Sequence, residues 1–163
     1  MTLEDIYYLS QIVAVIGIFV SLIFVGVQVR QNTKALKATS HHAVTNSFNA
    51  INNMMANDPA FARRWRLGMA GAGELNEDER LSFSFLSLAY MRIFETLYYQ
   101  YTNGTLDKKL FDAELQTLKW SFTKEHPGFL AWWATNPISL SAEFRAFIDG
   151  LIHDAQREAA ERK

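Results

Sequence analysis

The chain has 163 residues, 49% of them hydrophobic, with 16 basic and 17 acidic side chains and no cysteine. The abundant aromatic residues and the near-zero net charge exclude a disordered chain. The absence of cysteine from the sequence excludes disulfides, thiolate chemistry and cysteine zinc sites. Charges are unevenly placed, because residues 6–57 contain no acid and residues 6–29 contain no charge at all. This distribution predicts a membrane segment joined to a water-soluble part.

The uncharged stretch 6–29 is long enough to cross a bilayer. A helix of that length covers roughly 36 Å, whereas the hydrocarbon core is about 30 Å thick. A cleavable signal peptide is disfavoured, since Glu4 and Asp5 precede the stretch and no A-x-A-like cleavage site follows it. We therefore expect a retained single span in the lipid bilayer.

The charges that flank this stretch predict its orientation. Arg30, Lys34 and Lys37 follow it, whereas only acidic residues precede it. Loops rich in lysine and arginine stay on the cytoplasmic side of a membrane. We expect the N-terminus outside and everything after Arg30 in the cytoplasm.

Residues 81–101 are the other apolar stretch, but we do not expect them to span a membrane. Arg92 and Glu95 lie in the middle of the stretch. Each charge costs about 2.5–3.5 kcal/mol at the centre of a bilayer. The stretch is instead expected to be the central helix of a soluble bundle, with these two charges paired on one face.

Turn signals divide the rest of the chain into helix-length blocks. Residues 30–57 contain no glycine or proline, so the first helix is expected to continue from the span to Asn57. Later helices are expected to begin at the capping residues Asp58, Asn76, Asp107 and Ser141, and a short helix with Trp132 and Trp133 is expected between the last two breaks. The expected breaks are the glycine-rich residues 68–73, Asn103-Gly104, His126-Pro127-Gly128 and Asn136-Pro137.

The predicted fold class is all-α. An N-terminal transmembrane helix continues into a long cytoplasmic helix, which packs with a bundle of four to five further helices. We expect three segments: a transmembrane anchor over residues 1–30, a helical stalk over 31–57 and a cytoplasmic bundle over 58–163.

Sequence signatures of catalysis are missing from the chain. It has no glycine-rich phosphate loop, no G-x-S-x-G nucleophile elbow, no H-E-x-x-H and no Glu-x-x-His pair. The part from Asp58 onward has 13 basic and 15 acidic side chains without a basic stripe, which argues against nucleic acid as a partner. We expect no cofactor, no metal site and no enzymatic activity.

One face of the first helix, which we call the seam, is built from small or polar residues with a single exception, Phe24. The seam, taken in alternate steps of four and three, comprises Ser10, Ala14, Gly17, Ser21, Phe24, Gln28, Gln31, Ala35, Ala38, His42, Thr45, Asn49, Asn52 and Ala56. In membranes, small residues let helices approach closely, and polar ones add roughly 0.6–2 kcal/mol of interhelical bonding.

We expect the membrane half of the seam to mediate association between copies of the chain. The alternative is ordinary helix packing in the membrane and a solvated face in the cytoplasm. A conducting pore is disfavoured, because Phe24 would block its axis and no ring of charge would select ions.

Glu95 is a carboxylate inside a very apolar helix, so it needs a partner such as Arg92, Arg145 or a tyrosine hydroxyl. It is interpreted either as a buried pairing that fixes helix register or as a ligand contact. The adjacent Trp132 and Trp133 are likewise interpreted as core anchors or as the lining of a pocket.

Several strings resemble a recurring pattern in a family of short bacterial membrane-anchored proteins of unknown function. They lie at residues 27–36, 94–101, 104–107 and 127–133, at Trp120, and in Ser141-x-Glu143-Phe144-Arg145-x-Phe147-x-Asp149. The resemblance implies the bacterial inner membrane and one shared constellation of Glu95, Tyr98, Trp132, Arg145 and Asp149. It leaves open whether the constellation is core or site. The expected ligand contacts, if it is a site, are Glu95, Tyr98, Trp133, Arg145 and Asp149.

The sequence therefore predicts a single-pass, homo-oligomeric scaffold or interaction protein. An accessory subunit of a larger membrane complex is the first alternative, and a ligand-sensing or enzymatic bundle is the second.

The orientation has a direct test. A green fluorescent protein fused to the C-terminus is expected to fluoresce, because it would fold in the cytoplasm, and alkaline phosphatase at the same position is expected to be inactive. A dark fluorescent fusion together with an active phosphatase fusion would reverse the orientation.

Overall fold

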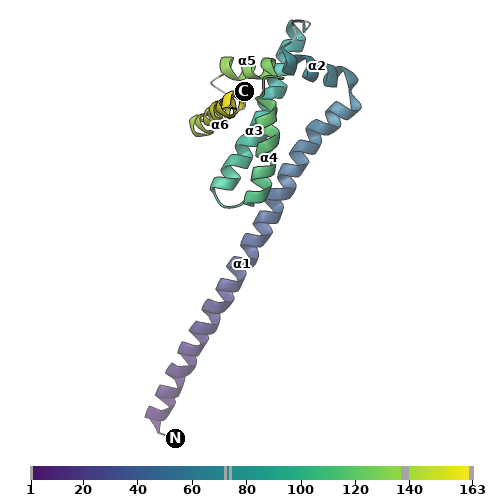
Figure 1. Cartoon of the computed structure of the whole chain (residues 1–163). Helices are drawn as coiled ribbons and strands as arrows, with labels where there is room; N and C mark the ends of the chain where they lie inside the picture. Colours follow the sequence, from purple (N-terminus) through teal and green to yellow (C-terminus); the bar gives the residue numbers. More distant parts are fainter. Residues whose placement is uncertain (1, 72, 74, 137–139, 162–163) are drawn as a thin grey trace. The chain divides into compact units, whose positions relative to one another are not determined.

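The structure, a computed structural model, describes residues 2–71, 73, 75–136 and 140–161. These residues form six α-helices and no strand (Figure 1), which confirms the all-α prediction. The helices are α1 (Leu3–Asn57), α2 (Pro59–Ala70), α3 (Glu77–Thr102), α4 (Lys108–Ser121), α5 (Pro127–Thr135) and α6 (Ala142–Glu161). Pro137, part of one expected break, lies outside the described residues.

The chain divides into two compact units, Met1–Thr39 and Ser40–Lys163. The division falls inside the segment 31–57 that was expected to be a stalk, and not after Asn57. The reason is that Val44 and Ile51 of α1 are buried in the core of the second unit, at 3% and 8% exposure. The second half of the expected stalk is therefore a helix of the bundle.

The first unit consists of the N-terminal part of α1. Its described side chains are exposed, including the apolar residues between Ile6 and Val29. Within the described part of the chain, α1 is the one helix that is long and apolar enough to cross a membrane. By length and composition it is a candidate membrane span.

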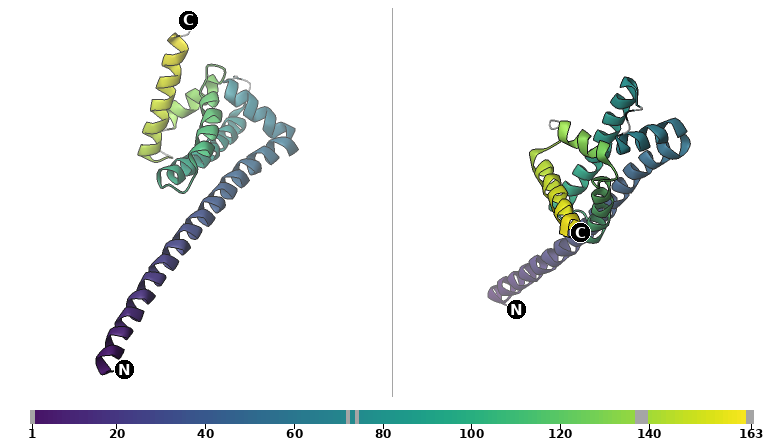
Figure 2. Two further views of the ribbon diagram at one scale, coloured as in Figure 1. Left: turned by 60° about the horizontal axis from the view of Figure 1, so that its bottom comes forward. Right: turned by 45° about the horizontal axis from the view of Figure 1, so that its top comes forward.

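The second unit is built around α3. Helices α3 and α4 lie side by side and run in opposite directions (Figure 1), α2 and α5 pack on α3, and α6 packs on α4 (Figure 2). The start of α2 is local, because Asp58 Oδ1 accepts hydrogen bonds from Ala60 N at 2.9 Å and Phe61 N at 3.1 Å. Pro59 occupies the first turn, where a missing N–H costs nothing.

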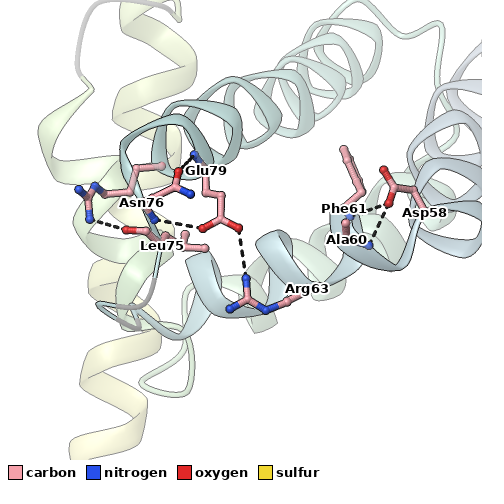
Figure 3. A network of polar contacts seen from close by, with 8 residues as sticks. Asp58, Ala60, Phe61, Arg63, Leu75, Asn76 and Glu79 are labelled. Carbon is pink, nitrogen blue, oxygen red and sulfur yellow. Dashed lines mark hydrogen bonds and ion pairs between the residues drawn. The ribbon is translucent and has the colours of Figure 1, made fainter.

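A capping box begins α3 and also ties it to α2 (Figure 3). Asn76 Oδ1 accepts from Glu79 N at 2.9 Å, and Glu79 Oε2 accepts from Asn76 N at 3.0 Å. The other oxygen of Glu79 accepts from Arg63 Nη1 of α2 at 3.2 Å. One carboxylate thus stabilises a helix start and a helix pair.

Tyr90 of α3 is the centre of the aromatic core. Its ring lies 5.0 Å from that of Phe94 and 5.5 Å from that of Trp65 on α2. Phe48 of α1 lies at 6.5 Å and Phe129 of α5 at 6.0 Å, in edge-on arrangements that aromatic quadrupoles favour. Four helices therefore meet at this side chain.

Helices α2 and α5 approach each other through backbone at three glycines. A Cβ on Gly128 would overlap the Gly68 carbonyl oxygen and lie 2.5 Å from Gly71 N. Gly71 ends α2 with φ +69°, a left-handed conformation that side chains disfavour. The sequence marks these positions as breaks, but the structure adds that they permit close helix packing.

Gly128→Ala is expected to lower stability by about 1–3 kcal/mol, because the added methyl must push two backbones apart. The check is the midpoint of thermal unfolding, which is measured by circular dichroism in a mild detergent. Gly150→Ala in α6 is the control: its Cβ would meet nothing within 4 Å, so it should leave the midpoint unchanged or raise it. Equal midpoints for the two variants would contradict the close approach of α2 and α5.

Candidate functional site

The structure brings together three of the five expected ligand contacts, Trp133, Arg145 and Asp149. The Trp133 indole N–H donates to Asp149 Oδ1 at 2.8 Å. Arg145 Nη2 donates to the Trp133 carbonyl oxygen at 2.9 Å, and its guanidinium carbon lies 4.5 Å from the centre of the Trp133 ring. These contacts join α5 to α6.

The sequence explains why Arg145 is needed there. The last carbonyls of a helix lack N–H partners within it. In α5 this holds especially for Trp133, because the residue four positions later is Pro137, which has no N–H. Arg145 supplies donors to Trp133 and, through Nη1 at 3.2 Å, to the carbonyl oxygen of Asn136. It acts as a distant cap for α5.

Glu95 bonds to the start of α6 and lies apart from the Trp133 group. Its Oε1 accepts from Ser141 N at 2.7 Å, and the Tyr99 hydroxyl donates to Ser141 Oγ at 2.8 Å. The Arg92 guanidinium, one of the partners expected for Glu95, lies 3.9 Å away. A carboxylate at a helix N-terminus is favourable because the exposed N–H groups there carry partial positive charge.

Tyr98, the remaining expected ligand contact, packs on α6. Its ring lies 5.7 Å from that of Phe144 and 4.9 Å from that of Phe147. Trp132, the fifth member of the implied constellation, donates from its indole nitrogen to Ser84 Oγ of α3 at 2.9 Å. Tyr98 thus packs its ring in the core, and the polar group of Trp132 is bonded to another helix, which favours the structural interpretation over a ligand site.

A different region carries a cavity of about 420 Å³, which we call the α1–α4 cleft. All of its lining residues belong to the second unit. Helix α1 contributes Thr45, Phe48, Asn49, Ile51, Asn52 and Met55. The other helices contribute Trp65 and Met69 from α2, Tyr90 from α3, and Glu114, Thr117, Trp120 and Ser121 from α4. The sequence pattern did not predict this site, although the polar positions of α1 are visible in it.

Glu114 is the one carboxylate in this lining. Partial burial raises its pKa above the usual value, while the nearby His41 opposes the shift. Among the described residues, Glu114 makes no hydrogen bond and no salt bridge. Burial without a partner disfavours the charged form, so Glu114 differs from Glu95, whose oxygens are bonded.

Aromatic rings form much of the remaining wall of the cleft. The rings of Trp65 and Tyr90, which both line the cleft, lie 5.5 Å apart. The Tyr90 hydroxyl lies 3.3 Å from Ser121 Oγ, and burial raises the pKa of Tyr90. Trp120 is 56% exposed although it is a large aromatic residue, and its ring meets His126 edge-on at 4.2 Å. A large exposed ring beside a cavity is a typical feature of binding sites.

The seam falls into two parts in the structure. Its positions from Ser10 to Ala38 belong to the first unit and are exposed. In the second unit His42, Thr45, Asn49 and Asn52 are also exposed, and the last three line the α1–α4 cleft. The polar character of these three residues suits a face that meets solvent and the cleft.

Among the described residues, no group of three or more histidine, aspartate and glutamate side chains could hold a metal ion. Comparisons with protein-family models, curated proteins and solved structures found no match to this chain. The resemblance to bacterial membrane-anchored proteins stays a prediction.

Asp149→Leu is expected to lower stability by about 1–3 kcal/mol, because it leaves the buried Trp133 indole N–H without an acceptor. Asp149→Asn is the matched control: its side-chain oxygen can still accept that bond, so stability should stay within about 1 kcal/mol of the wild type. The free energy of unfolding of both variants is measured by chemical denaturation, with tryptophan fluorescence as the signal. Equal losses in the two variants would mean that the charge of Asp149, and not the hydrogen bond, is what matters.

Proposed function

We propose that this protein is a single-pass membrane anchor that associates with itself through its span and holds a helical interaction module at the membrane surface. The observation that carries the proposal is the exposure of the first unit. An apolar helix that finds no partner within its own unit needs lipid or other helices around it.

Small residues on the span favour other copies of the chain as part of that surrounding. Gly17 lies on the seam, one helical turn from Ala14 and Ser21. A Cβ added at Gly17 would meet nothing within 4 Å in the unit. Packing within the unit therefore does not require a glycine at this position. A glycine here would, however, let a second helix approach closely.

The setting we propose is the bacterial inner membrane, with the N-terminus outside and the bundle in the cytoplasm. The basic residues after the span support this orientation. Because the second unit carries a helical core and no catalytic signature, we propose binding and not catalysis as its task.

Gly17→Leu is expected to shift the protein from oligomer towards monomer, because the larger side chain separates the helices. Light scattering combined with size-exclusion chromatography in mild detergent measures the mass of the protein within the micelle. The effect on intrinsic helix stability should be small, since the added side chain meets open space.

Gly26→Leu is the matched control. Gly26 lies nine residues from Gly17, which places it on the opposite side of the helix, and its Cβ also meets nothing within 4 Å. It should leave the oligomer intact. A wild-type protein that is monomeric, or two variants that behave alike, would contradict association through the seam. A second protein recovered in stoichiometric amount would favour the accessory-subunit alternative.

A further inference from the structure

The side chains that line the α1–α4 cleft include polar and charged groups that packing of the core does not require. It is lined by one carboxylate, by several aromatic rings and by the amides of Asn49 and Asn52. The carboxylate of Glu114 has no bonded partner among the described residues, although burial at this position penalises its charge.

The charge of the lining indicates what it would bind. No lysine or arginine lines the cleft, so its only formal charge at neutral pH comes from Glu114. His41 lies close enough to act on this carboxylate electrostatically, but it is exposed and is not part of the lining. A cation within the cleft would remove the penalty that an unpaired carboxylate carries.

The aromatic rings add a second preference for a cation. The faces of tryptophan and tyrosine rings are negative, so they attract ammonium groups at short range. Trp65, Tyr90 and Trp120 line the cleft together with Glu114. Aromatic rings grouped with a carboxylate are the usual means by which proteins hold organic ammonium ions.

The remaining lining accommodates the body of such a ligand. Phe48, Met55 and Met69 provide apolar surface, and Thr117 with the two asparagines provides hydrogen-bond donors and acceptors. A volume of about 420 Å³ falls within the range of roughly 300–1,000 Å³ that small-molecule sites occupy.

We propose that the α1–α4 cleft binds a small organic ammonium ion, with the ammonium group between Glu114 and the aromatic rings. The ion is either a free alkylammonium compound or the headgroup of a lipid, since both carry the same chemistry. The site does not depend on association through the span, because every lining residue comes from the second unit of one chain.

The test is calorimetric titration of the full-length chain in dodecyl maltoside, an uncharged detergent. Choline and butylammonium are the cationic probes, and 3,3-dimethylbutanol is the neutral control, in which carbon replaces the choline nitrogen. At least one cationic probe is expected to bind at least about tenfold more tightly than the neutral compound. Equal affinities, or no binding of either cation up to about 10 mM, would overturn the proposal.

Two variants locate the site. Glu114→Gln keeps the shape of the side chain but removes its charge, and Trp120→Leu removes an exposed ring. Each is expected to weaken cation binding about tenfold or more. Glu143→Gln, an exposed acid on α6, is the control for overall charge and should bind as the wild type does. Undiminished binding by Glu114→Gln would overturn the assignment, and the wild-type comparison of cation with neutral compound stands if either variant fails to fold.

Changing the lipid around the protein shows whether the bound cation is a free compound or a lipid headgroup. The titration with the cationic probe that binds more tightly is repeated in nanodiscs of phosphatidylcholine and of phosphatidylglycerol. Weaker binding in phosphatidylcholine alone would assign the cleft to a lipid headgroup, through competition. Equal binding in both membranes would assign it to a free cation. Binding that is absent from both membranes would overturn the site.

Discussion

The aromatic packing around Tyr90 is the interaction on which the second unit depends. Its ring contacts side chains from α1, α2 and α5. Its hydroxyl, which would be costly to bury alone, lies 3.3 Å from Ser121 on α4. One side chain therefore connects five helices, including its own. The second half of α1 belongs to the bundle for this reason, and the α1–α4 cleft lies where the ring meets α4.

Two glutamates in apolar surroundings show how burial and pairing together decide the role of a charged residue. Glu95 accepts a hydrogen bond from the first turn of α6, so its charge stabilises a helix start. Arg145 and Asp149 are similarly bonded to α5. Groups satisfied in this way have little capacity left for a ligand. Glu114, which lacks such a bond in the described part of the chain, keeps that capacity, and for this reason the cleft is the stronger candidate site.

A single periodic pattern on α1 serves two environments. Within the first unit, small seam residues such as Gly17 lie on an exposed apolar helix, where they would permit close contact with another helix. Within the second unit, the polar seam residues Thr45 and Asn49 line a cavity. Phe48, which lies between them in the sequence, packs its ring against Phe94 in the core. The shorter side chains of Thr45 and Asn49 line the space between α1 and α4. The same spacing thus places small residues on an exposed apolar helix in one unit and polar residues along a cavity in the other.

The sequence by itself determined the helices, because helix signals are local. Asp58 caps α2, and the capping box of Asn76 and Glu79 begins α3, through bonds that join residues two or three positions apart. The candidate span was equally readable, since length and the absence of charge suffice to predict one.

Only the tertiary structure decided which polar residues are paired and where a cavity remains. Glu95 accepts a hydrogen bond from Ser141, which is 46 residues away in the sequence. Trp133 donates one to Asp149, which is 16 residues away. The cleft requires side chains from four helices, and the boundary at Ser40 requires the core into which Val44 is buried. Such contacts depend on how helices pack, because periodicity specifies the face of a helix but not the partner that the face meets.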